Sequence, residues 1–148
     1  WQKRKLDTQR SPLQRQISIY RRTKTHLLLN IKELIIYHNS HCSKSRECLA
    51  FLKEEEYPIE IVDYLKNPPS VEEIKELLRK LAIKPIDLVR KKEAIWKEVG
   101  SDTLSDEQII DLLHQYPKLI ERPILIDGER AIIARPLSAA QQWLHTTE

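Results

Sequence analysis

Two hydrophobic periods alternate along the chain, and each change of period marks a new element. The apolar run Leu34 to Tyr37 has the length and content of a buried strand, and Ile59 to Tyr64 alternates apolar with charged positions as a strand does. Further on, Pro123 to Ile126 and Ala131 to Ala134 flank Asp127-Gly128, a signal for a tight hairpin. The pattern therefore predicts four strands, of which the last two form a hairpin.

Helical spacing fills the intervals between these strands. Two predicted helices begin with a capping box, in which a serine and the residue three positions later bond to each other's backbone amides. The others are placed by apolar spacing and by Gly or Pro at their ends. The capping boxes are Ser70 with Glu73 and Ser105 with Gln108, and each begins a helix. A helix is also predicted from Cys42 through Leu52, and another from its cap Ser138 through Leu144. Between Ile86 and Gly100 we expect a short turn and a helix that contain Arg90 and stop at Gly100.

This order of elements predicts an α/β protein with a thioredoxin-like fold, a mixed sheet with flanking helices and a helical insertion. The 148 residues are 41% apolar and 32% charged, as in a soluble globular domain. No apolar run approaches the roughly 18 residues that a membrane span needs. Cys42 and Cys48 lie six positions apart, about 9 Å along a helix axis, which does not suit a disulfide. Both are expected to be reduced, in the cytoplasm.

Positive charge is concentrated at the N-terminus. Residues 1–30 hold eight Lys or Arg and one acid, whereas the whole chain has a net charge of only +3. Residues 1–32 show no sustained period, so we expect a basic, disordered extension ahead of a domain over residues 33–148. It could be a transit peptide, a nucleic-acid-binding arm, or a solvated or non-native tail. The start at Trp1, the lack of methionine and the lack of interleaved aromatic residues favour the tail over nucleic-acid binding.

A cysteine stands where the first strand gives way to the first helix. The free N–H groups and positive dipole end of a helix favour an anion, so the Cys42 thiol should lose its proton easily. The same amides could hold an oxyanion beside the sulfur. His38, Lys44 and Arg46 add donors or positive charge nearby. The alternative is a small buried apolar cysteine, and the polar neighbours leave the two interpretations equally open.

The segment YHNSHCSKSRECL around Cys42 resembles the active-site segment of the glutaredoxin-dependent arsenate reductase family, the ArsC type. That family's pattern runs approximately Tyr-His-Asn-Pro-x-Cys-x-x-Ser-Arg, and here Ser40 replaces the proline and His41 stands at the variable position. Four further matches follow in the family's order: YLKNPPS at Tyr64 to Ser70, LVRKKE at Leu88 to Glu93, LIERPILI at Leu119 to Ile126 and ARPLS at Ala134 to Ser138. The resemblance covers residues 33–138 and implies the same thioredoxin-like fold.

The resemblance implies a division of roles between a cysteine and three arginines. Cys42 would attack arsenate, and Arg90, Arg122 and Arg135 would hold its oxygens, because planar guanidinium groups bind tetrahedral anions bidentately and keep their charge. Each arginine also has a plainer interpretation. Arg90 could lie on a solvated helix face, and the other two could form local ion pairs with Glu121 or Glu129.

The remaining site residues support the thiolate or order the turn before it. A protonated His38 would lower the thiol pKa by its charge, unless it merely closes the turn. Ser45, one helical turn after the cysteine, could donate its hydroxyl to the thiolate. Asn39 and Arg46 match the pattern as residues of the substrate-binding turn. Pro123 corresponds to the cis-proline that thioredoxin-like folds place facing the cysteine.

The chain has no second thiol at the position where it could resolve an intermediate on Cys42, so the reducing thiol is expected to come from another molecule. The fourth position of a Cys-x-x-Cys motif is here Ser45, so an arsenic-cysteine adduct needs an outside thiol. The resemblance implies glutathione as co-substrate and then glutaredoxin, with no bound cofactor, and no metal site is predicted. We therefore expect a cytoplasmic oxidoreductase, an arsenate reductase. The alternatives are an Spx-like regulator that binds RNA polymerase, and a family member that acts on another oxyanion or thiol substrate.

Overall fold

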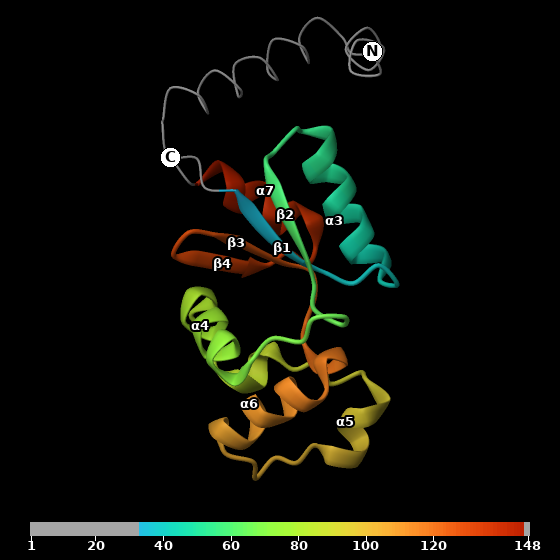
Figure 1. Cartoon of the computed structure of the whole chain (residues 1–148), viewed down its shortest axis with the longest axis vertical. Coiled ribbons are helices and arrows are strands. Elements are labelled where there is room, and N and C mark those ends of the chain that lie inside the picture. The colour runs from blue at the N-terminus through green and yellow to red at the C-terminus, as the bar shows by residue number, and fades with distance from the viewer. Residues whose placement is uncertain (1–32, 147–148) are drawn as a thin grey trace, which may run out of the picture.

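The computed structural model describes residues 33–146, in which one four-stranded sheet carries helices on one face and at one end (Figure 1). The strand order is β2-β1-β3-β4. Strands β1 and β2 are parallel, and β3 is antiparallel to both β1 and β4, so the sheet is mixed as predicted. The strands are β1 (Leu34–His38), β2 (Ile59–Asp63), β3 (Ile124–Asp127) and β4 (Arg130–Ile133).

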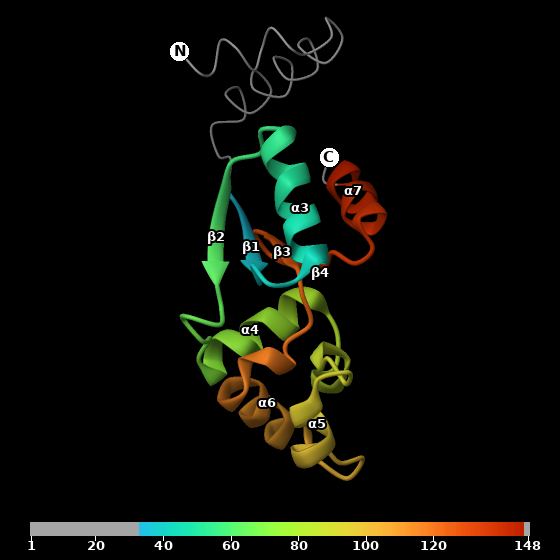
Figure 2. The same ribbon diagram turned by 90° about the vertical axis from the view of Figure 1, so that its right-hand side faces the viewer.

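Two helices cover one face of the sheet, and the others gather beyond the carboxyl end of β1, as Figure 2 shows. Helix α4 packs against β4 and α6, which anchors the helical insertion to the sheet. The helical elements are α3 (Ser43–Glu54), α4 (Val71–Leu81), the 3-10 helix η1 (Pro85–Leu88), α5 (Ala94–Val99), α6 (Asp106–Gln115), the 3-10 helix η2 (Pro117–Leu119) and α7 (Leu137–His145). Within residues 33–146, no helix is long and apolar enough to cross a bilayer.

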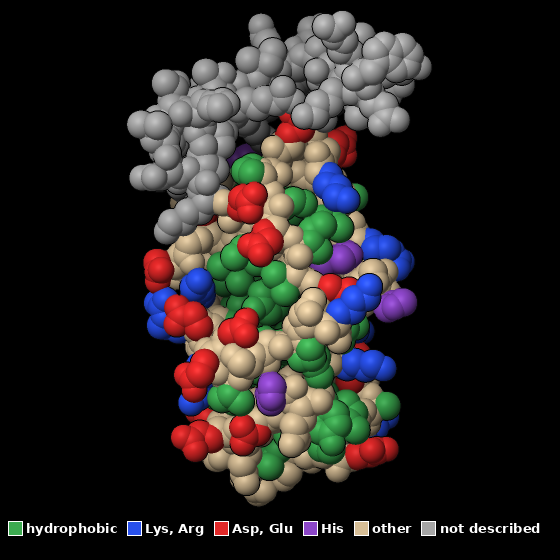
Figure 3. All heavy atoms as spheres, in the orientation of Figure 1, with side chains coloured by type: hydrophobic (Ala, Val, Ile, Leu, Met, Phe, Trp, Pro, Cys, Tyr) green, Lys and Arg blue, Asp and Glu red, His purple; other side chains and the backbone are tan. Residues whose placement is uncertain are grey.

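Strand β1 is buried on both faces because it lies inside the sheet. Leu34 and Ile36 point into a core shared with α3 and α7, whereas Tyr37 packs into a second core with α4 and α6. Alternate residues of a strand point to opposite faces, so one short apolar run feeds both cores. Figure 3 shows hydrophobic side chains gathered over the face of the sheet that α3 and α7 leave uncovered.

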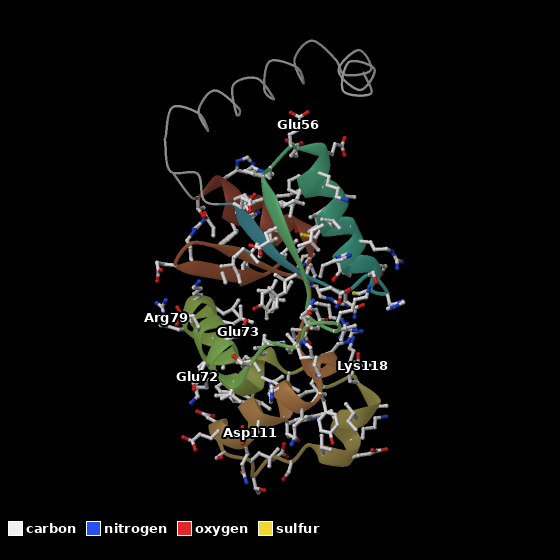
Figure 4. The ribbon with its side chains drawn as sticks, in the orientation of Figure 1. Glu56, Glu72, Glu73, Arg79, Asp111 and Lys118 are labelled. Atoms are coloured by element: carbon white, nitrogen blue, oxygen red, sulfur yellow. The ribbon has the colours of Figure 1, made fainter. Side chains whose placement is uncertain are left out.

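Both predicted capping boxes are present. Ser70 accepts from the Glu73 amide at 3.1 Å and Ser105 from the Gln108 amide at 3.2 Å, with the reciprocal bonds also formed. The hairpin turn is also confirmed, with Gly128 at φ 61°, where glycine carries no Cβ penalty. Arg79 of α4, which is labelled in Figure 4, forms an exposed ion pair with Glu129 next to this turn at 2.7 Å.

The predicted turn and helix from Ile86 to Gly100 are present as η1 and α5, with Gly100 as the C-cap, but the expectation that they contain Arg90 is wrong. The backbone of Arg90 donates to the Leu119 carbonyl at 2.6 Å, and Val89 forms an isolated β-bridge with Ile120. These bonds hold Arg90 in an extended segment between η1 and α5, because distant backbone groups compete with the local helical pattern.

The predicted cap of the last helix is also wrong. Helix α7 begins at Leu137 with Pro136 as its N-cap, so Ser138 lies in the first turn and caps nothing. Proline has a fixed φ and no N–H to satisfy, which suits it to a helix start. The expected basic extension over residues 1–32 lies outside the described residues.

Candidate active site

Cys42 stands at the N-cap of α3, directly after β1 and its turn. Its backbone N–H donates to the Asn39 carbonyl at 3.0 Å, and its carbonyl accepts the first helical bond from Arg46 at 3.0 Å. Partial burial raises the pKa of the thiol, but hydrogen bonds from the Ser45 amide, the Arg122 guanidinium and the Lys44 amide bring this pKa down to about 7. The Cys42 thiol therefore loses its proton more easily than an ordinary cysteine thiol.

Cys48 has the opposite environment on the same helix. Its side chain is fully buried in the core between the sheet and helices α3 and α7. Burial raises the pKa of this thiol to about 11, and Glu47 adds to the effect. Both cysteines are free, as predicted, and only Cys42 has the reactivity of a nucleophile.

Arg122 lies two residues before the start of β3. Its side chain is only 9% exposed, and the Arg122–Pro123 peptide bond is cis. One guanidinium nitrogen donates to the Lys118 carbonyl at 3.0 Å and another to Glu93 Oε1 at 3.1 Å. The predicted local partners Glu121 and Glu129 are not the ones it uses. Arg122 is therefore a buried cation held in a fixed place beside the sulfur.

Glu93 joins this arginine to a second one. Its Oε1 lies 3.4 Å from Arg90 Nε as well as 3.1 Å from Arg122. The two cations thus share one carboxylate, which leaves a positive excess between them. Sequence reasoning did not single out Glu93, although it is the last residue of the LVRKKE match.

Arg135 occupies a different position from the other two arginines. It is exposed and lines a cavity of about 270 Å³ together with Arg90. The other residues that line the cavity are Val89, Lys91, Lys92 and Glu121. Arg90 is therefore common to the cavity and to the buried cluster around Glu93, and the cavity is strongly positive.

Unpartnered polar atoms concentrate around these residues. Within residues 33–146, six buried side-chain nitrogen or oxygen atoms make no hydrogen bond. Such atoms are rare in folded proteins because each costs free energy. They are His38 Nδ1, Ser45 Oγ, Tyr64 Oη, Arg90 Nε and Nη1, and Arg122 Nε. Buried cationic donors that make no hydrogen bond could serve an oxyanion, although Arg90 Nε also forms the ion pair with Glu93.

His38 differs from its expected charge state. It is 9% exposed, and burial lowers its pKa although Asp63 on the neighbouring strand acts in the opposite direction. The imidazole is therefore neutral at neutral pH, and the expected charge effect of a protonated His38 on Cys42 does not apply. The physical reason is desolvation, which a sequence pattern does not reveal.

The polar turn before Cys42 is held by its own side chains. Buried Asn39 accepts from the His41 amide at 2.9 Å through Oδ1, and exposed Arg46 donates to the Ser40 carbonyl at 2.9 Å. These bonds order the turn that Ser40 would otherwise leave less rigid than a proline. Ser45 is fully buried, and its amide rather than its hydroxyl bonds to the Cys42 sulfur.

A metal centre has no support in this part of the protein. Among the described residues, no three His, Cys, Asp or Glu side chains come together to hold an ion. The site consists of one thiol and several guanidinium and ammonium groups. Such a set repels cations and attracts anions.

A cysteine with a lowered thiol pKa after a central strand, beside a residue followed by a cis-proline, is the arrangement of a thioredoxin-like protein. The profile of the ArsC family matches residues 37–143. The chain belongs to the ArsC family.

Its similarity to individual relatives extends over nearly their whole length. An arsenate reductase of Neisseria meningitidis serogroup A is 36% identical over 108 residues, 71% of this chain and 92% of the relative. An uncharacterised protein of Escherichia coli K12 is 41% identical over 108 residues, 71% of this chain and 91% of the relative. The solved structure of an arsenate reductase from Vibrio cholerae is 38% identical to this chain and matches it with a TM-score of 0.72. The match covers 76% of this chain and 98% of the Vibrio cholerae chain.

Proposed function

We propose that this protein reduces arsenate to arsenite, with Cys42 as the nucleophile and outside thiols as the reductant. The observation that carries the proposal is the Cys42 thiol with a pKa of about 7, hydrogen bonded to the buried Arg122 guanidinium. Relatives named arsenate reductases support the choice of anion.

The first step is the attack of the Cys42 thiolate on arsenic(V). A sulfur-arsenic bond forms, and one arsenate oxygen leaves as water after taking up two protons. Arg122 and Arg90 neutralise the negative charge that would otherwise repel the thiolate, and they stabilise charge on the remaining oxygens. The Ser45 and Lys44 amides at the start of α3 hold the sulfur as an anion before the attack.

The second step needs two electrons that the protein does not supply. Cys48 is buried with a raised thiol pKa, and Ser45 stands at the position of a resolving cysteine. Glutathione would replace another arsenic-bound oxygen, and a glutaredoxin thiolate would then attack the glutathione sulfur. The electron pair of the broken sulfur-arsenic bond stays on arsenic, which becomes arsenic(III). A mixed disulfide forms, and water releases arsenite from Cys42.

We infer that the charged cavity draws the anion toward Arg90, which also belongs to the cluster around Glu93. Arg135, Lys91 and Lys92 line this cavity next to Arg90, so arsenate would meet positive charge before it meets the sulfur. We infer a cytoplasmic location, because glutathione and glutaredoxin keep thiols reduced there.

A coupled assay tests the proposal. Arsenate-dependent oxidation of NADPH is followed with glutathione, glutaredoxin and glutathione reductase present. The wild-type protein and Cys48→Ser should turn over arsenate, whereas Cys42→Ser should show no rate above background. A wild-type protein without an arsenate-dependent rate, but with a reactive Cys42, would refute the reductase and leave another oxyanion or thiol substrate.

The Spx-like alternative has less support. The resemblance implies that most regulators of that type carry Cys-x-x-Cys, and here Ser45 stands at the fourth position of that motif. Binding of purified RNA polymerase by the wild-type chain, together with no turnover in the coupled assay, would favour it instead.

A further inference from the structure

The cavity beside Arg90 is larger and more mixed in charge than a site for arsenate alone requires. Its volume of about 270 Å³ exceeds what one tetrahedral anion fills, since a water molecule takes up roughly 30 Å³ in the liquid. Its lining combines the cationic side chains with one carboxylate, that of Glu121. A carboxylate repels arsenate, so Glu121 has no place in a site for an oxyanion alone.

Glu121 is fixed in the wall of this cavity by its backbone. Its N–H donates to the Leu88 carbonyl at 2.9 Å. On the other side of the Val89–Ile120 bridge, the Arg90 N–H donates to the Leu119 carbonyl at 2.6 Å. The carboxylate and the guanidinium therefore line the cavity from one short antiparallel ladder, whose two segments come from distant parts of the chain.

Most charged side chains of the wall have no partner inside the described part of the protein. Among residues 33–146, no ion pair involves the Glu121 carboxylate. The same holds for Lys91, Lys92 and Arg135, whereas Arg90 pairs with Glu93 at 3.4 Å. Charges of both signs thus face one cavity without being matched by the protein itself, which favours a ligand that carries both signs.

Glutathione has the charges that such a wall would bind. At neutral pH it carries two carboxylates and one ammonium group along a flexible tripeptide, with the thiol between its two ends. Lysine and arginine side chains donate charge-assisted hydrogen bonds to carboxylates, and a glutamate accepts them from an ammonium group. The ligand has a net negative charge, and the wall has a net positive charge.

We propose that the cavity beside Arg90 is the binding site of glutathione, whose ammonium group pairs with Glu121 and whose carboxylates pair with the lysines and Arg135. Arg90 borders this cavity and shares the Glu93 carboxylate with Arg122. An arsenate held between the two arginines would lie at the edge of the cavity. The thiol of a bound glutathione would meet it there.

The inference rests on the proposed function for the use of glutathione, but its test requires neither arsenate reduction nor turnover. S-methylglutathione keeps all the charged groups of glutathione and cannot react through its sulfur. Its binding to the full chain is followed by NMR titration. A protein that reduces no arsenate can still bind this probe, and one that reduces arsenate can fail to bind it, so the two failures are distinguishable.

Glu121→Gln separates this site from an oxyanion site by the sign of its effect. Loss of the carboxylate should weaken S-methylglutathione binding about tenfold, because a charge-assisted bond to the ammonium group is lost. Arsenate binding should stay the same or become tighter, because a negative charge leaves the wall. Glu98→Gln, exposed on α5 and outside the cavity, is the matched control. No binding by the wild type, or equal affinity of wild type and Glu121→Gln, would overturn the proposal.

A second pair of variants tests the cationic side of the wall. Lys92→Gln should weaken S-methylglutathione binding about threefold, because an ion pair with a carboxylate is lost at a solvent-exposed position. Lys97→Gln, also exposed but outside the cavity on α5, should leave the affinity unchanged. Equal dissociation constants for the two lysine variants would show that binding follows the overall charge of the protein, and the proposal would be wrong.

Discussion

The Arg122 guanidinium donates a hydrogen bond to the sulfur of Cys42, although the two residues are eighty positions apart in the sequence. Arg122 lies just before β3, and β3 pairs with β1, the strand that leads into Cys42. The sheet therefore sets the distance between the proposed nucleophile and its main cation. An anion held by Arg122 would lie next to the thiolate without a large movement of the chain.

Alkylation of Cys42 should follow a thiol pKa of about 7. The rate constant with iodoacetamide is expected to rise with pH, to reach half its maximum near pH 7, and to level off about a unit above. Cys42→Ser should remove the reaction, because Cys48 is buried and its thiol pKa is about 11. A midpoint near 9, the value of an ordinary cysteine, would contradict the role assigned to Arg122 and the α3 amides.

The same pKa makes a prediction for stability. The folded thiol ionises near pH 7, below its ordinary value of 9.0, so the native state binds fewer protons than the unfolded state between these values. The stabilisation by the thiolate is fully present above pH 9 and is lost as the pH falls through 7. Urea unfolding of the wild type and of Cys42→Ser should therefore differ more at pH 9 than at pH 6. A difference that is constant over this range would contradict the shifted pKa.

The lowered pKa of His38 should make the stability of the protein depend on pH in the opposite sense to a histidine that is held protonated in the folded state. Its folded pKa lies below the ordinary value of 6.5, so the unfolded state takes up a proton first as the pH falls. The contribution of neutral His38 to stability is present above pH 6.5 and decreases below it. In urea unfolding, His38→Gln should lose less stability than the wild type between pH 7.5 and pH 5.

The shared carboxylate of Glu93 can be tested with a charge-removing change. Glu93→Gln keeps the shape of the side chain but weakens the bonds to Arg90 and Arg122, so the two cations should hold an anion less well. We expect the arsenate KM to rise about tenfold, with a smaller change in kcat. Glu107→Gln, on the exposed face of α6, is the matched control and should leave both constants unchanged. An unchanged KM for Glu93→Gln would show that the carboxylate does not organise the two arginines.

Substitutions of Ser105 and Ser138, two serines at helix starts, should differ in their effect on the stability of the protein. Ser105→Ala removes a side-chain bond to the Gln108 amide and should destabilise the protein by about 1 kcal/mol. Ser138→Ala changes an exposed residue inside the first turn of α7 and should cost less than about 0.5 kcal/mol. Thermal and urea unfolding of both variants would measure this difference. Equal losses would contradict the assignment of Pro136 as the N-cap.

Much of the fold could be predicted because its signals are local. The four strands, both capping boxes and the position of Cys42 at a strand-helix junction each depend on a few neighbouring residues. Arg90 was misplaced on a helix because its backbone bonds to Leu119, about thirty residues away. The local sequence pattern around Arg90 does not reveal that a backbone group so distant in the chain competes with helical hydrogen bonds.

The site was predicted less completely than the fold, for a related reason. The motifs supplied Cys42 and the arginines, but the link from Glu93 to Arg122 depends on two segments that meet only in the folded protein. The neutral state of His38 depends on burial, which raises the cost of its charge. Tyr64 was part of a quoted match but had no assigned role, because its hydroxyl becomes notable only where the packing leaves it unpaired.

The Val89–Ile120 bridge closes the base of a lobe that contains α5 and α6. Arg90 directly follows Val89 and Arg122 lies two residues after Ile120, so the bridge sets the spacing of the two arginines. The tip of the lobe, between α5 and α6, is distant from this bridge along the chain. Insertions between α5 and α6 would lengthen the tip without moving either guanidinium, so the lobe could vary in length while the chemistry at its neck stays the same.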